Sequence, residues 1–301
     1  MRRPSSPGEP TALELLIILK LLNGLTTGAL YALTAFGLTF ILGMLNIPNF
    51  AHGAIFALGG YVGLALAHLT GSYWAALVGA PIVLAAFGVC IERGLLRPLY
   101  GNAPDDENYL LLALFALAII LQELIIMIWG AAGESIMPPA ALNGAMQLGP
   151  ILYPKFRIFV LLATGLMVLA SWLLIERTRV GALIKAAIEN RDAVMLLGVD
   201  IRILFAASFA FGTLLTAFAG VLSLPIRGVH PFIGMDILTV SFVIVVVGGM
   251  GNLYGAIFAG LLIGLLQEFA TLISPLAAWP AVYLAMMAVL LFRPKGLFGK
   301  R

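Results

Sequence analysis

The chain has 301 residues, of which 62% are hydrophobic and 10% are charged, and its net charge is +3. Soluble domains are nearer half apolar and a quarter charged, so this composition, with a mean hydropathy of +1.08, predicts a protein of the lipid bilayer and gives no case for nucleic-acid binding. The 33 glycines are typical of membrane helices that pack closely, and the single cysteine, Cys90, excludes an internal disulfide.

Apolar segments along the chain predict an all-α polytopic membrane protein with eight to ten membrane helices, because a helix needs about 20 mainly apolar residues to cross a bilayer. Segments 12–22 and 237–248 are short, and whether 12–22 is joined to 24–45 or crosses separately stays open. The candidate segments are 12–22, 24–45, 54–70, 74–91, 109–129, 157–175, 203–224, 237–248, 253–272 and 276–292. We expect a single transmembrane domain over 12–292, between tails at 1–11 and 293–301.

The positions of the basic residues predict the orientation of the chain. Lys and Arg are concentrated in residues 1–11, 92–107, 176–202 and 293–301. Because cytoplasmic loops carry an excess of these residues, we expect these regions, and with them both termini, on the cytoplasmic side. An even number of crossings must then follow residue 202, with GGMGN at 248–252 as a tight turn. The loop at 71–73 is poor in Lys and Arg and is expected on the opposite side, so an odd number of crossings must separate it from the N-terminal tail.

A five-residue motif, GAIFA, occurs at 53–57 and again at 255–259, each time shortly after an Asn in an irregular, Gly-containing stretch. Many transporters place interrupted helices at the substrate path, in matching positions of two repeats. The motifs therefore predict two helix breaks that flank a shared path. The alternative, that both are close-packed turns in a Gly- and Ala-rich chain, stays open. An inverted repeat is not favoured, because the helices after both breaks run in the same direction in the expected topology.

A second repeat, Leu-Gln-Glu at 121–123 and 266–268, puts Glu123 and Glu268 inside apolar segments. An intramembrane carboxylate is costly and is a candidate functional group. An ion-coupled secondary transporter that uses these two residues is therefore an alternative function. The other interpretation is that each carboxylate lies near a helix end and is hydrogen-bonded to a neighbouring helix.

Motifs of catalysis are absent from the sequence. The three histidines lack metal-ligand spacing, and neither a nucleophile motif nor a phosphate-binding loop of the form G-x-x-x-x-G-K-[ST] occurs. We therefore expect no enzyme, no metal site and no cofactor in this chain. Any energy from ATP must come from a partner.

Residues 182–197 predict a short amphipathic helix in the cytoplasm, ended by Gly198. Its polar side would carry Lys185, Glu189 and Asp192, and its apolar side Ala187, Val194 and Leu197. An isolated helix with an apolar side needs a partner to cover it. A groove on another protein is the simplest partner, and the lipid surface is the alternative.

Several stretches resemble the permeases of branched-chain amino-acid ABC importers, the LivH type, and they follow in that family's order over nearly the whole chain. One is NGLTTGALYALTAFGLTFILGMLNIPNFAHGAIFALGGY at 23–61, and another is VVVGGMGNLYGAIFAGLLIGLLQE at 245–268. AFAGVL at 217–222 and RPKGLFG at 293–299 are similar to further signatures, and GALIKAAIENRDAVMLLGVDI at 181–201 to the coupling loop.

The resemblance implies a multi-pass subunit of a bacterial inner-membrane importer, which would pair with a second, related permease. Two cytoplasmic ATPase subunits that bind ATP and an extracytoplasmic solute-binding protein would complete the assembly. The coupling loop would seat in a groove of an ATPase subunit. The candidate coupling residues are Gly181, Lys185, Ala187, Glu189, Asp192, Leu197 and Gly198.

The resemblance leaves the substrate open among branched-chain amino acids, urea, short amides, and aromatic or dicarboxylic acids. A zwitterion would suit the backbone amides at a helix break, and side chains near the breaks would add polar contacts. The candidate path residues are Tyr31, Asn49, His52, Gly53, Gly249, Asn252 and Gly255.

Overall fold

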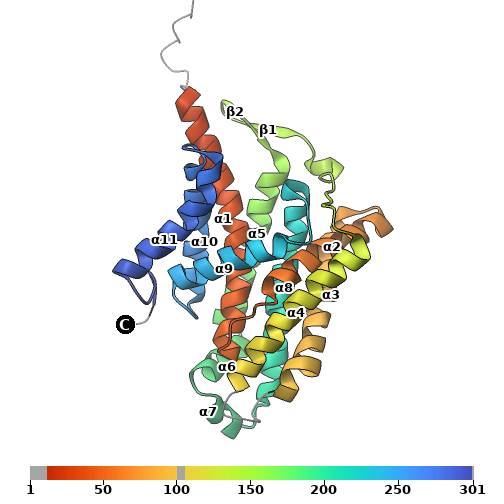
Figure 1. Ribbon diagram of the computed structural model, residues 1–301, viewed down its shortest axis with the longest axis vertical. Helices are drawn as coiled ribbons and strands as arrows, with labels where there is room; N and C mark the ends of the chain where they lie inside the picture. Colours follow the sequence, from red (N-terminus) through yellow and green to blue (C-terminus); the bar gives the residue numbers. More distant parts are fainter. Residues whose placement is uncertain (1–11, 100–105, 300–301) are drawn as a thin grey trace, which may run out of the picture.

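The computed structural model describes residues 12–99 and 106–299 of the chain (Figure 1). These residues are mainly helical, and they form one sheet, a two-stranded antiparallel hairpin. The α-helices are α1 (Ala12–Leu45), α2 (His52–Thr70), α3 (Tyr73–Ile91), α4 (Asp106–Trp129), α5 (Lys155–Arg177), α6 (Arg179–Glu189), α7 (Arg191–Leu196), α8 (Ile201–Arg227), α9 (Ile233–Gly248), α10 (Leu253–Ala270) and α11 (Ala278–Phe292). The strands are β1 (Ala145–Leu148) and β2 (Ile151–Pro154), and short π and 3-10 turns follow α3, precede β1 and precede α11.

Eight of the described helical segments are long and apolar enough to cross a membrane, and α9, with 16 residues, is shorter. At 1.5 Å per residue α9 reaches about 24 Å, less than the roughly 30 Å hydrocarbon core of a bilayer. The expected all-α polytopic fold with eight to ten membrane segments is confirmed.

Helix α1 is one continuous helix of 34 residues, which joins the two segments that the sequence left separate. The Asn23-Gly24 pair does not break it. A Cβ added at Gly24 would lie 2.9 Å from the Cα of Leu265 in α10, so this glycine serves close packing. Helix α1 begins at the end of the molecule that carries the β1–β2 hairpin and ends beside α6 and α7 (Figure 1).

This continuous helix changes the expected topology of the first segments. Helices α1 and α2 make two passes, and the turn after α2 lies beside residues 136–140, which lead to the hairpin. The expected odd number of crossings before residues 71–73 is therefore wrong. The start of α1 lies at the opposite end from α6 and α7, whereas we expected residues 1–11 and 177–202 on one side. Residues 1–11 themselves lie outside the described part of the chain.

The C-terminal third contains α8 to α11 in sequence, with the predicted tight turn between α9 and α10, and three of these segments, α8, α10 and α11 with the short turn before it, are long enough to cross a membrane. Gly249 and Gly251 have φ of +99° and +77°, which favours glycine at both positions. The segment after α11 returns to this turn, where the backbone N–H of Leu297 donates to the carbonyl of Val247 at 2.8 Å. The turn lies at the end that carries α6 and α7, since Met250 and Ile188 line one cavity.

The closest helix pair is α1 with α10, and small residues permit it. Gly24, Gly28 and Ala32 of α1 face Gly260 and Gly264 of α10 at four-residue spacing, and the backbones at Gly28 and Gly264 are in contact. This small-xxx-small pattern is the usual device for close packing of membrane helices.

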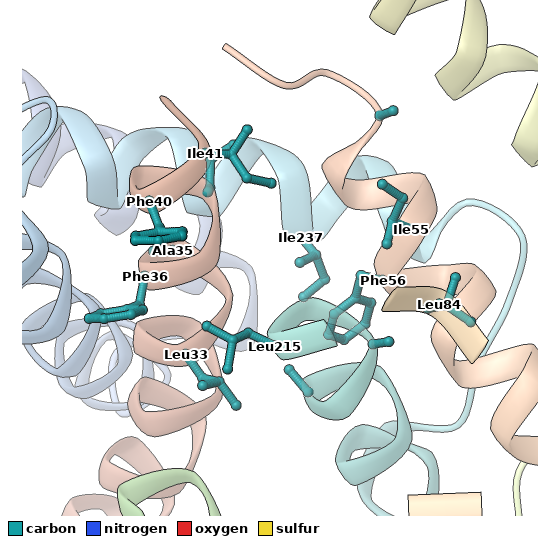
Figure 2. Packing of buried hydrophobic residues seen from close by; sticks show 14 of the residues in the cluster. Leu33, Ala35, Phe36, Phe40, Ile41, Ile55, Phe56, Leu84, Leu215 and Ile237 are labelled. Atoms are coloured by element: carbon teal, nitrogen blue, oxygen red, sulfur yellow. The ribbon is translucent and has the colours of Figure 1, made fainter. Parts of the chain in front are cut away.

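Around this pair, larger side chains fill a single core. Figure 2 shows Leu33 of α1, Phe56 of α2, Leu215 of α8 and Ile237 of α9 converging on one another. The core therefore fixes α9 against α1, α2 and α8.

We predict that Gly264→Leu lowers stability by about 1–3 kcal/mol, because a side chain there overlaps the backbone of α1. Gly165→Leu in α5 is the matched control, since nothing lies within 4 Å of a Cβ at Gly165. The measurement is the thermal midpoint of the detergent-purified protein. Equal midpoints for the two variants would contradict the packing account.

Candidate functional site

The break between α1 and α2 is anchored by buried polar contacts. Asn49 is fully buried, and its Oδ1 accepts a hydrogen bond from the backbone N–H of Ala51 at 3.0 Å. His52 is also fully buried, with Nε2 at 2.9 Å from both the carbonyl oxygen of Thr34 in α1 and Oγ1 of Thr216 in α8. These contacts tie the start of α2 to two neighbouring helices. The role of both residues in a substrate path stays a prediction.

The two GAIFA motifs begin α2 and α10 and hold the two ends of α9. At the start of α9, a Cβ on Gly234 would lie 2.6 Å from the carbonyl oxygen of Gly53. At its end, a Cβ on Gly248 would lie 2.5 Å from the carbonyl oxygen of Gly255. The breaks therefore flank one short helix, and in this structure their glycines act through backbone contact.

Asn252 acts as a cap and a tether. Its Oδ1 accepts from the backbone N–H of Gly255 at 3.0 Å, which satisfies a free donor at the start of α10. Its Nδ2 donates to the carbonyl of Phe298 at 2.7 Å, and a Cβ at Gly249 would lie 2.8 Å from the backbone nitrogen of Gly299. Gly249 and Asn252 thus hold the C-terminal segment against the α9–α10 turn.

Tyr31 is buried in a polar cluster that includes the second Leu-Gln-Glu motif. Its hydroxyl donates to Oε1 of Gln267 at 2.9 Å, and Arg227 donates to the same hydroxyl at 3.3 Å. Next to this cluster, Glu268 forms an ion pair with Lys20 at 3.4 Å. The carboxylate of Glu268 therefore has a fixed cationic partner across the α1–α10 contact, as the hydrogen-bonded interpretation of this motif requires. Glu123 is exposed on α4.

The predicted coupling helix is two helices, so the single helix over 182–197 is wrong. Asn190 has an extended backbone and caps α7 by accepting from the N–H of Ala193 at 3.0 Å, which ends α6 and starts a new helix. Two contacts join α6 to α5. Gly181 of α6 packs against the backbone of Ile175 of α5, and Lys185 of α6 forms an ion pair with Glu176 of α5 at 2.7 Å.

Gly198 has a φ of +80°, so the predicted stop is confirmed. The apolar side of the segment is mostly covered by the chain itself. Ala187 and Val194 are buried in the core, which corrects the expectation that they wait for a partner. Val180 and Ile188 of α6 are partly to largely exposed, and Met195, Leu196 and Leu197 form an exposed apolar group at the end of α7, where Leu196 is 88% exposed. The side chain of Asp192 lies outside the described part, and Glu189 lines a cavity.

Arg191 fixes this exposed tip to the membrane helices. Its Nη2 donates to the carbonyl of Met44 at the end of α1 at 2.8 Å, and its guanidinium lies 5.0 Å from the ring centre of Phe205 in α8. Arg191 was not among the predicted site residues, because it lay in the middle of the helix predicted over 182–197 and belonged to no motif.

Two cavities lie along α9, and neither was predicted from the sequence. A cavity of about 890 Å³ opens at the end that carries α6 and α7, between Asn46, Glu189 and Val246. A second, of about 290 Å³, lies between the start of α2, α4 and α9, and Phe242 lines both. Among the described residues, no group of His, Cys, Asp and Glu is arranged to hold a metal ion.

Comparison with known proteins identifies the family. The family model described as branched-chain amino acid transport system / permease component matches residues 20–291. BraD of Pseudomonas aeruginosa, a high-affinity branched-chain amino acid transport system permease protein, is 30% identical over 295 residues, covering 93% of this chain and 95% of BraD. LivH of Escherichia coli K12 is 29% identical over 297 residues with the same coverage.

A solved structure, PsaBC from Streptococcus pneumoniae in complex with Fab, aligns with a TM-score of 0.46 at 14% identity, over 90% of this chain and 89% of that one. The chain belongs to the family of permease components of branched-chain amino acid transport systems. The resemblance found in the sequence is therefore confirmed.

We predict that Lys20→Met alone destabilises the protein, because it leaves the half-buried carboxylate of Glu268 without its cation. Lys20→Met combined with Glu268→Gln should regain most of the lost stability and keep transport, as expected for a structural pair. The measurement is the thermal midpoint with solute uptake. Loss of uptake in the double variant at normal stability would contradict this account and favour an ion-coupling carboxylate.

Proposed function

We propose that this chain is one of two related permease subunits of an ABC importer in the bacterial inner membrane. Two cytoplasmic ATPase subunits would bind ATP on the α6–α7 side, and an extracytoplasmic binding protein would deliver the solute. The family match over residues 20–291 carries this proposal. The chain itself would bind neither ATP nor a cofactor.

The α7 tip, Met195–Leu197, is the surface that we assign to the ATPase groove. It presents exposed apolar side chains on a short helix, the geometry of helix-in-groove recognition. A movement of the tip would displace α1 through the hydrogen bond from Arg191 to the carbonyl of Met44. It would displace α5 through the ion pair between Lys185 and Glu176.

The same ion pair extends the connection to α10. Tyr254 donates to Oε1 of Glu176 at 3.3 Å and accepts from the indole of Trp172 at 2.9 Å. Closure of the ATPases can then shift the balance between two permease states, because it changes the relative stability of the connected helices.

The substrate that we propose is a branched-chain amino acid. BraD and LivH are named for this solute class and align over nearly their whole length. The permease would bind the solute weakly, because the binding protein supplies affinity. An ion-coupled secondary transporter is not favoured, since Glu268 is held by Lys20.

The test is reconstitution of the importer, purified with the ATPases and second permease that copurify with this chain, in proteoliposomes with the binding protein. We expect ATP-dependent uptake of leucine, isoleucine or valine, and no uptake without ATP. Uptake by this chain alone, driven by an ion gradient, would contradict the proposal.

We predict that Leu196→Glu combined with Leu197→Glu abolishes copurification of the ATPases without loss of membrane insertion, because two charges replace the apolar tip. Leu196→Met, which keeps an apolar side chain, is the control and should retain the ATPases. By contrast, Ala187→Glu should lower stability itself, since Ala187 is buried inside the chain. The proposed contact is wrong if the double variant retains ATPases and ATP-driven uptake.

A further inference from the structure

Helix α9 has one face in the core and one face without cover in this chain. Figure 2 shows Ile237 pointing from α9 toward Phe56 and Leu215. The opposite face, which we call the uncovered face, carries Met235 and Asp236, which are exposed, and Thr239 and Phe242, which are partly exposed.

Asp236 makes this uncovered face unsuitable for lipid. It lies in the first turn of α9, next to the Gly234–Gly53 contact, and α9 crosses the middle of the molecule (Figure 1). A carboxylate that faces hydrocarbon is costly. None of the ion pairs among the described residues includes Asp236. Its charge calls for water or for a cation that is not part of the described chain.

The cavity of about 290 Å³ lies along the same helix. Phe115, Ala118 and Gln122 line it from α4, at a spacing that puts them on one side of that helix, and Leu238 and Thr239 line it from α9. Ligand pockets of roughly 300–1,000 Å³ take drug-sized molecules, so this cavity suits a smaller group.

The polar groups of this cavity are few. The lining side chains are mainly aliphatic and aromatic, and Gln122 and Thr239 supply the amide and the hydroxyl. The hydroxyl of Thr239 donates to the carbonyl of Met235 at 2.8 Å, which leaves its oxygen able to accept. An apolar pocket with one or two polar groups is the usual form of a small-molecule site.

Two phenylalanines separate this cavity from the larger one. The rings of Phe50 and Phe242 lie 5.3 Å apart between centroids, and Phe242 also lines the cavity of about 890 Å³ that opens at the α6–α7 end. Phe50 belongs to the break between α1 and α2, so its position depends on the same anchors as His52.

We propose that the 290 Å³ cavity receives the aliphatic side chain of the transported amino acid, and that Asp236, which does not line the cavity but follows its lining residue Met235 in α9, binds the ammonium group. The Phe50–Phe242 pair is the gate between this site and the larger cavity. This assignment rests on the proposed function. The negative charge of Asp236 complements an ammonium group and does not complement a lipid tail.

The first test compares Ala118→Leu with Ala116→Leu in the reconstituted importer. Ala118 lines the cavity, whereas Ala116 is exposed elsewhere on α4 and does not. Filling the cavity should lower leucine uptake by about tenfold or more, as expected for lost volume in an apolar pocket, and should affect valine less. The Ala116 variant should transport normally.

Asp236→Asn tests the charge. We expect the KM for leucine to rise by about tenfold, with partial recovery in Asp236→Glu. An unchanged KM in the Asn variant would overturn the assignment of Asp236.

A second measurement does not depend on turnover. In a Cys90→Ala background, Thr239→Cys should react with a cationic thiol reagent, and leucine should slow the reaction, whereas Ala116→Cys should not react. If Thr239→Cys is unreactive and Ala118→Leu loses the second permease, the cavity is a subunit contact and the proposal is wrong. If Thr239→Cys is unreactive and Ala118→Leu transports normally, the cavity holds lipid and the proposal is equally wrong.

The proposed function and this assignment fail in different ways. If the unaltered importer takes up urea and not leucine, the proposed function is contradicted in its substrate. If the unaltered importer takes up leucine and Ala118→Leu does so equally well, only the cavity assignment is overturned.

Discussion

The backbone contacts that hold α9 at its two ends constrain the rest of the structure. Gly234 lies against Gly53 at one end, and Gly248 lies against Gly255 at the other. Any Cβ at these four positions would overlap backbone atoms. Because α9 is too short to span a bilayer by itself, it needs neighbours to fix its depth. The starts of α2 and α10 provide them through these backbone contacts.

The same arrangement connects the middle of the protein to the end that carries α6 and α7. The break before α2 carries Phe50 beside α9, and the turn after α9 lies with Met250 in the larger cavity, opposite Asn190 and Arg191. Arg191 in turn bonds to the end of α1. A displacement at the α7 tip can therefore act on α9 through packed backbone and a few charged contacts, without a flexible linker.

Much of this architecture was predictable from residues in sequence. Apolar length predicted the membrane helices, Gly198 predicted the end of the segment that carries α6 and α7, and the Gly- and Asn-containing motifs predicted the breaks before α2 and α10. The break at Asn190 was missed because a capping Asn and a helix-interior Asn look alike without the backbone.

The features that could not be predicted from the sequence depend on contacts between distant segments. The sequence left open whether segments 12–22 and 24–45 are joined; in the structure Gly24, between them, packs on Leu265 of α10, about 240 residues away, and α1 is continuous. The burial of Ala187 also arises from tertiary neighbours. Asp236 and the α4 side chains around Gln122 carry no motif, and only the fold brings them to one place.

The central claim is that the solute passes along the uncovered face of α9. The most direct measurement is a cryo-EM structure of the complete importer trapped with leucine in transit. The account predicts ligand density between α4 and α9, in contact with Thr239 and next to Asp236. Density elsewhere, with the second permease packed tightly over Thr239 and Phe242, would contradict it.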